Sequence, residues 1–170
     1  IFTASATTTG AYLTRTTDSL KNVLAPGKLT VEVKEPGWQE KSGEAVLPKE
    51  SRTKNPLVKN TGTLDSWMFL EVNIPIRRIS LVDENTKRKQ PEGETELFRF
   101  RINAGWELIE KTRTGNDMHY VYGWKEMVAP TKQTGTLFDS ITMVPYLDGS
   151  LNDKEVYQIR VTAKAIQKNI

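Results

Sequence analysis

Strict alternation of apolar and polar positions is the sequence feature that most limits what this chain can fold into. From Met68 to Ile74 every second residue is apolar, and the same period of two recurs at residues 29–33 and 157–165. Successive side chains of a β-strand point to opposite faces of a sheet, so this period predicts strands with one buried face. Pro75 lacks an amide hydrogen, so the first of these strands is expected to end there or to continue along a sheet edge.

The rest of the chain reads as more strands joined by turns. Extended structure is predicted at residues 57–60, 96–103, 120–124 and 137–144, and turn residues occur at Asn60–Gly62, Gly115–Asn116 and Asp148–Ser150. Gly and Asn favour such turns because they tolerate positive φ. Eight to ten short strands without a convincing long helix predict an all-β fold, a jelly-roll-like β-sandwich in one domain.

The first fourteen residues have a different composition. They are rich in threonine and contain no charged side chain. β-branched residues favour extended backbone, and exposed strand edges are normally guarded by charge or proline. An unguarded, β-prone segment therefore predicts an extended N-terminal arm, residues 1–12, that pairs with another strand, followed by the sandwich domain at residues 13–170.

Composition narrows the classes of function. The 24 basic residues exceed the 21 acidic ones by three, and both signs are interspersed, which does not point to nucleic acid. The basic run Lys87–Lys89 lies among polar residues and is interpreted as a solvated loop. There is no cysteine, so disulfides and thiol catalysis are excluded. No apolar run is long enough to span a membrane, and we expect any signal peptide to have been removed.

Several stretches, in order and spacing, resemble one family. The stretches are Ala11-Tyr12-Leu13-Thr14, Leu29–Val33 followed by Glu35-Pro36-Gly37-Trp38, Lys54–Gly62, Tyr120–Trp124, Ala129-Pro130, Thr136–Phe138 and Tyr157–Gln167. Together they resemble the TasA/camelysin family, whose members are exported through the SipW-type signal peptidase. The resemblance covers residues 10 to 167. In many relatives the segment matching Ala11–Thr14 lies almost at the mature N-terminus, whereas ten residues precede it here. Ala4-Ser5-Ala6 resembles a signal-peptidase site, so residues 1–6 could belong to the precursor; the favoured interpretation is processing upstream and a longer arm.

The resemblance implies a secreted structural subunit of an extracellular fibre, in a biofilm matrix or on the cell surface. In this family's fibres the N-terminal segment of one subunit inserts as a donor strand into the next, giving a head-to-tail homopolymer. An anchoring or minor fibre protein is a further expected partner, and no enzyme activity, cofactor or bound metal is expected. The predicted donor strand consists of Ile1, Phe2, Thr3, Ala4, Ser5, Ala6, Thr7, Thr8, Thr9 and Gly10.

A camelysin-like metallopeptidase is one alternative function. A catalytic zinc ion usually has three protein ligands, commonly two of them histidines. This chain has one histidine, His119, and the nearest carboxylates in sequence are Glu107, Glu110, Asp117 and Glu126. No Gly-x-Ser-x-Gly elbow or phosphate-binding glycine loop is present. The favoured interpretation is that His119 faces solvent or a neighbouring strand beside Tyr120.

Two binding sites are further alternatives. A carbohydrate-binding module often presents aromatic rings to sugars, and the chain has four tryptophans, Trp38, Trp67, Trp106 and Trp124. Tryptophans at strand positions more often fill a core or a subunit contact. Asp148, Asn152, Asp153 and Glu155 supply oxygen ligands near a glycine turn and could hold calcium, although their spacing is not that of an EF-hand. A plain turn is the favoured interpretation there.

Overall fold

A computed structural model describes residues 2–3, 11–13, 16–17, 27, 29–37, 47–152, 155 and 157–167. These residues form an all-β structure, with no helix among them. The strands are β1 (Phe2–Thr3), β2 (Ala11–Leu13), β3 (Thr16–Thr17), β4 (Val31–Lys34), β5 (Ser51–Thr53), β6 (Leu57–Asn60), β7 (Ser66–Ile79), β8 (Gly93–Glu96), β9 (Phe98–Phe100), β10 (Trp106–Thr114), β11 (Asp117–Trp124), β12 (Ser140–Met143) and β13 (Arg160–Gln167).

The largest sheet is built around β7, the long strand that the alternation predicts. Its order is β10-β11-β7-β13-β2, and β8 pairs with the far end of β7. All neighbours in this sheet are antiparallel except β13 and β2, which are parallel. The even-numbered residues from Met68 to Ile74 are fully buried, as the period of two requires.

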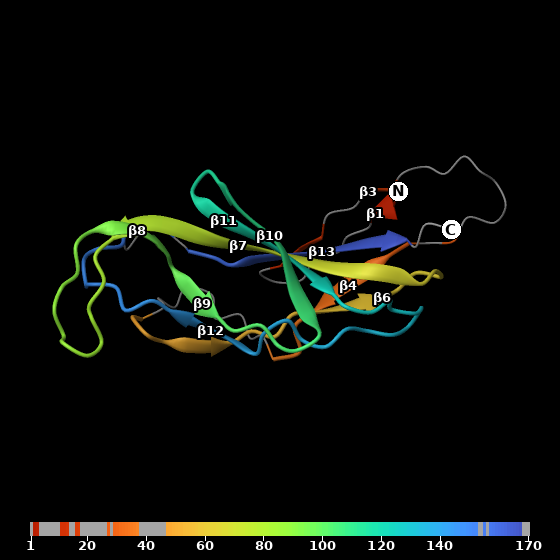
Figure 1. Cartoon of the computed structure of the whole chain (residues 1–170), viewed down its shortest axis with the longest axis horizontal. Coiled ribbons are helices and arrows are strands. Elements are labelled where there is room, and N and C mark those ends of the chain that lie inside the picture. Colours follow the sequence, from red (N-terminus) through yellow and green to blue (C-terminus); the bar gives the residue numbers. More distant parts are fainter. Residues whose placement is uncertain are drawn as a thin grey trace.

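Smaller sheets form the second layer. One has the order β5-β12-β9 and the other is the antiparallel pair β4-β6. Figure 1 shows β9 and β12, and then β4 and β6, following one another along one side of the large sheet. One apolar core lies between the layers and includes Leu70 from β7, Val33 from β4, Val58 from β6 and Phe138 from the segment before β12. The predicted β-sandwich is confirmed at this level of description.

Most predicted strands are present, with some differences in extent. β7 continues past Pro75 to Ile79, where its partners β11 and β13 give way to β8. The strand predicted at residues 96–103 is instead two short strands, β8 and β9, and β8 begins three residues before the predicted start, at Gly93. The predicted turn at Gly115–Asn116 closes the β10–β11 hairpin, with Gly115 at a φ of 61°. The basic run Lys87–Lys89 is exposed, as expected of a loop.

Candidate functional site

At one edge of the large sheet, β13 is covered only in part, by the three-residue strand β2. β13 has eight residues, and β2 pairs in parallel with Val161–Ala163 alone. The other side of β13 pairs with β7 over all eight residues. From Lys164 to Gln167, β13 therefore has no hydrogen-bonded strand on its β2 side within the described part of the chain. A strand edge with unpaired backbone groups can pair with a strand from another chain.

The opposite edge of the large sheet is β10. It pairs with β11 on one side, and the described residues place no strand on the other. A bulge interrupts its register between Leu108 and Glu110, and the following residues, Glu110–Arg113, carry three charged side chains. Bulges and charges are the devices by which proteins protect a sheet edge from adding strands. The β10 edge is thus protected against the addition of a strand. On the open part of β13, Lys164 is the one charged residue and uncharged residues follow it.

Apolar side chains gather on the outer face of the large sheet, the face turned away from the core. Ile166 on β13 is 40% exposed and is the cross-strand partner of Trp67 on β7, which is 38% exposed. Phe69 lies next along β7, and a Cβ added to Gly123 would meet the side chains of both Ile109 and Phe69. Trp67, Phe69, Ile109 and Ile166 are called the outer-face patch below. Exposed apolar groups clustered in this way mark an interaction surface.

Polar side chains follow the outer-face patch along the same face. Lys164 Nζ lies 2.8 Å from Glu71 Oε1, and His119 Nε2 lies 3.7 Å from the same oxygen. His119 Nδ1 is 2.7 Å from Asn73 Oδ1, and because that oxygen can only accept, Nδ1–H donates. The expectation that His119 contacts a neighbouring strand is met by this bond. Among the described residues, no serine or threonine hydroxyl is bonded to the imidazole.

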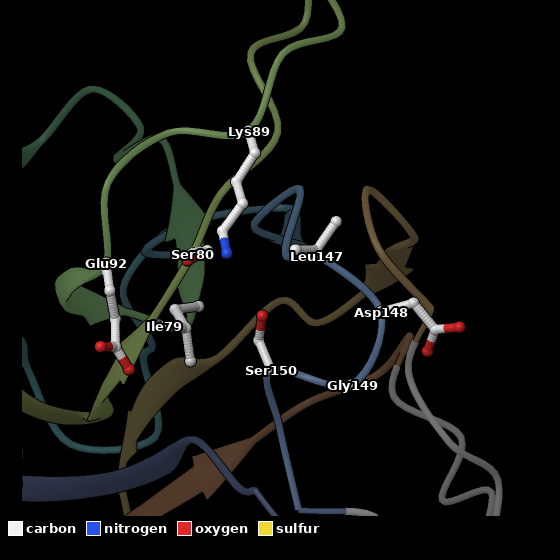
Figure 2. A pocket seen from close by; sticks show the side chains of 8 residues that line it. All are labelled: Ile79, Ser80, Lys89, Glu92, Leu147, Asp148, Gly149 and Ser150. Atoms are coloured by element: carbon white, nitrogen blue, oxygen red, sulfur yellow. The ribbon is translucent and has the colours of Figure 1, made fainter.

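The candidate metal ligands are not brought together. Within the described ranges, no group of three or more His, Asp or Glu side chains is placed to hold a metal ion. Of the calcium candidates, Glu155 forms an ion pair with Arg77, and Asp153 lies outside the described residues. Asp148 lines an open hollow of about 410 Å³ beside Lys89, Glu92 and Ser150. Figure 2 shows the Asp148 carboxylate pointing away from Lys89 and Glu92.

The described tryptophans differ in exposure. Trp106 is buried, its Nε1–H donates to the carbonyl of Gly135, and its ring lies edge-on against Trp124. Both belong to the core or pack against it. Trp67 is the exposed one, and Trp38 lies outside the described residues. Trp67 stands beside the open half of β13, so it is part of the candidate interaction surface.

Tyrosines on the inner face of β11 form an aromatic cluster with Phe100. Tyr120 and Tyr122 stack with ring centroids 5.9 Å apart, and Phe100 meets each of them edge-on. The Tyr120 hydroxyl donates to Glu96. Burial raises the pKa of Tyr122 to about 12, and it raises the pKa of Tyr120 further, with help from the Glu96 hydrogen bond. Both phenols therefore stay protonated at neutral pH, as structural groups do.

The predicted donor strand is described in part. Phe2–Thr3 forms β1, which pairs antiparallel with β3 and lies beside β13. Ile1 and residues 4–10 lie outside the described residues. Ala11 and Tyr12, expected in the arm, form the edge strand β2 together with Leu13, expected at the start of the sandwich. The sequence did not reveal the outer-face patch, because Trp67 and Phe69 sit at positions that alternation assigns to the polar face.

Comparison of the chain with family models, with curated proteins and with solved structures finds no match. No helix among the described residues is long and apolar enough to cross a membrane.

Proposed function

We propose that this protein is a structural subunit of an extracellular fibre. In the proposed fibre, the N-terminal arm of one copy adds as a strand to the large sheet of the next copy, alongside β13. The proposal rests on the resemblance to the TasA/camelysin family and on one structural observation. That observation is the edge of β13, of which only three residues have a hydrogen-bonded partner in β2.

The open half of β13 is suited to receive a strand. Lys164–Gln167 offers backbone groups on its β2 side, and Ile166 within it is exposed. An added strand would satisfy the backbone groups, and its side chains would cover Ile166 and Trp67. Backbone hydrogen bonds give affinity in this mode of recognition, and alternate side-chain contacts give register.

The arm gives up little stabilising free energy when it leaves its own subunit. Within the monomer, the described part of residues 1–10 is β1, a two-residue strand paired with the two-residue β3. Such short pairings contribute little, because a two-stranded ribbon is at best marginally stable in water. Exchanging them for a longer pairing on a neighbour is the logic of domain swapping. Residues 1–10, fully extended, would reach roughly 33 Å at about 3.3 Å per residue.

The proposed contact is heterologous, since the arm and the β13 edge are different surfaces. Such contacts propagate into open filaments unless the rotation between copies closes a ring. The proposed partner is therefore another copy of the chain, with an anchoring or minor fibre protein at a filament end. Secretion to an extracellular matrix or to the cell surface is part of the same proposal and rests on the family resemblance.

Electron microscopy of two forms tests the proposal. Full-length protein should form filaments, and a form starting at Ala11 should remain as dispersed particles. The shorter form keeps β2 and the whole sandwich, so circular dichroism should show unchanged β-structure. Filaments that persist without residues 1–10 would contradict the proposal.

A point substitution separates the role of the arm from loss of length. Phe2→Asp places a charge in the arm where it is proposed to pack beside the exposed Ile166 of a neighbouring copy, and burial of an unpaired charge is unfavourable. We expect it to block filament growth. Asn116→Asp adds the same charge at the exposed β10–β11 turn and should leave growth unchanged. Equal growth of both variants would show that Phe2 does not enter a neighbouring subunit.

A further inference from the structure

A lysine and a glutamate are buried together in the second layer. Lys54 follows β5 and Glu35 follows β4, and the side chains are 1% and 3% exposed. Lys54 Nζ lies 2.7 Å from Glu35 Oε1. Removing both charges from water is unfavourable, and the attraction between them repays this only when further hydrogen bonds complete the site. Nothing in the proposed assembly mechanism uses this pair.

The surrounding backbone holds the two side chains opposite each other. The amide of Gly37 donates to Asn55 Oδ1 at 2.8 Å, which fixes the turn after Glu35 against the residue that follows Lys54. A Cβ on Gly37 would lie 2.7 Å from the Thr53 methyl group, so the turn is pressed closely onto the end of β5. The amide of Lys54 itself donates to the carbonyl of Asp139 at 3.1 Å. The contact is thus set by the fold on both sides.

The Glu35 carboxylate is not satisfied as a buried carboxylate usually is. Among the described residues, the Lys54 ammonium group is the polar contact of this carboxylate, and no other group donates a hydrogen bond to either of its oxygens. Burial lowers the pKa of Lys54, and the Glu35 charge opposes that shift. A desolvated amine shifted in this direction is a nucleophile.

We propose that Lys54 and Glu35 condense into an intramolecular isopeptide bond. A proton first passes from the ammonium group to the carboxylate, which leaves a neutral amine beside a neutral carboxylic acid. The Nζ lone pair attacks Glu35 Cδ, the C–N bond forms, and one C–O bond breaks. The departing hydroxyl takes a proton from Nζ and leaves as water. Ammonium plus carboxylate thus becomes amide plus water, with no change in oxidation state.

Proximity and burial favour this reaction. Well-oriented intramolecular groups react with effective molarities of about 10⁵ to 10⁸ M, because the entropy of bringing them together is already lost on folding. Condensation also replaces two buried charges with a neutral amide, and burying an amide costs less free energy than burying two charges. Exposed pairs such as Lys49–Glu84, 3.8 Å apart and about half exposed, have neither advantage.

The bond would join the two small sheets of the second layer. Glu35 directly follows β4 of the β4–β6 pair, and Lys54 directly follows β5 of the three-stranded sheet. It would also close the chain between residues 35 and 54 into a covalent loop. The inference does not depend on fibre formation, so either proposal can fail without the other.

The mass of the intact protein tests the inference. The purified full-length chain is held folded in neutral buffer, then denatured and measured by mass spectrometry. We expect a mass lower than that of the sequence by one water molecule. Trypsin should no longer cleave after Lys54, and a branched peptide should join the segments that contain Lys54 and Glu35. The full sequence mass, with normal cleavage after Lys54, would overturn the inference.

Matched variants assign the missing water to this pair. Lys54→Met and Glu35→Ala should each have the full mass of their sequence. Lys49→Met, which removes the exposed Lys49–Glu84 pair, should still lack one water. A water deficit that persists in Lys54→Met would place the dehydration elsewhere and refute the assignment. The wild-type measurement decides the matter even if a variant fails to fold.

Discussion

At the scale of single residues, Asn60 shows how one buried amide can hold a chain crossing. Its Nδ2 group donates to the carbonyls of Leu64 and Val128, each at 2.8 Å, and its Oδ1 accepts from the amide of Gly62 at 2.9 Å. Asn60 ends β6, and the following residues cross to the other layer, where β7 begins. The side chain therefore satisfies backbone groups that the crossing would otherwise leave unpaired inside the protein.

Asn60→Ala should lower the free energy of unfolding by about 3 kcal/mol, because buried backbone groups lose their partners. Urea unfolding followed by tryptophan fluorescence measures this change. Thr61→Ala is the matched control. It removes one exposed hydroxyl contact to Thr30 and should change stability by less than about 1 kcal/mol. Equal effects of the two substitutions would contradict the role assigned to Asn60.

Ionisation of Tyr122 should lower the free energy of unfolding at high pH. Its pKa is raised from 10.0 to about 12 by burial, so the folded state holds its proton over a range where the unfolded chain has lost it. The stabilisation is complete below pH 10 and is lost as pH rises toward 12, by on the order of 2 kcal/mol. Tyr122→Phe should reduce this slope in urea unfolding measured across that range. An unchanged slope would refute the assignment.

At the scale of elements, β7 connects the separate parts of the sandwich. Its first part lies between β11 and β13, and its last part pairs with β8. The change of partner occurs at Pro75, which has no amide hydrogen to give to a ladder. The amide of Ile76 instead donates to the carbonyl of Asn116, and that of Leu97 to the carbonyl of Pro75. Proline thus marks a junction within a strand.

Hydrogen exchange should divide β7 at this junction. Residues Phe69–Asn73 are paired with a strand on both sides, and the inner face of this part of β7 is fully buried, so their amides should exchange only through global unfolding. Amides of β8 pair with β7 alone and should exchange sooner through local opening. Mass spectrometry of peptic peptides measures both. Equal protection of β8 and of the first part of β7 would contradict this division.

Strand faces were more predictable from the sequence than strand partners. Alternation identified the inner faces of β4, β7 and β13, because burial of one face imposes a period of two. β8 was missed because its sequence, Gly-Glu-Thr-Glu, has no apolar residue to reveal a face. The role of Asn60 was read as a turn preference, whereas its amide is buried. Lys54 and Glu35 resemble solvated charges in sequence, and only their pairing across two strand ends distinguishes them.

At the scale of the whole molecule, one core unites a large sheet with two small ones. The arrangement of layers could be inferred in outline from many short strands without helices. The split of the second layer could not, since no local pattern states which strands will pair. The same holds for the open half of β13, because an edge is a property of topology and β13 reads as an ordinary half-buried strand.

The parallel pairing of β2 with β13 sets how the molecule would respond to tension. The two strands come from the two ends of the described chain and run in the same direction. Force that draws the chain apart from before Ala11 and after Gln167 acts along these strands in opposite senses. Their hydrogen bonds are then sheared together, whereas an antiparallel pair pulled from one end opens one bond at a time. A subunit built in this way resists stretching along its strands better than its few terminal hydrogen bonds suggest.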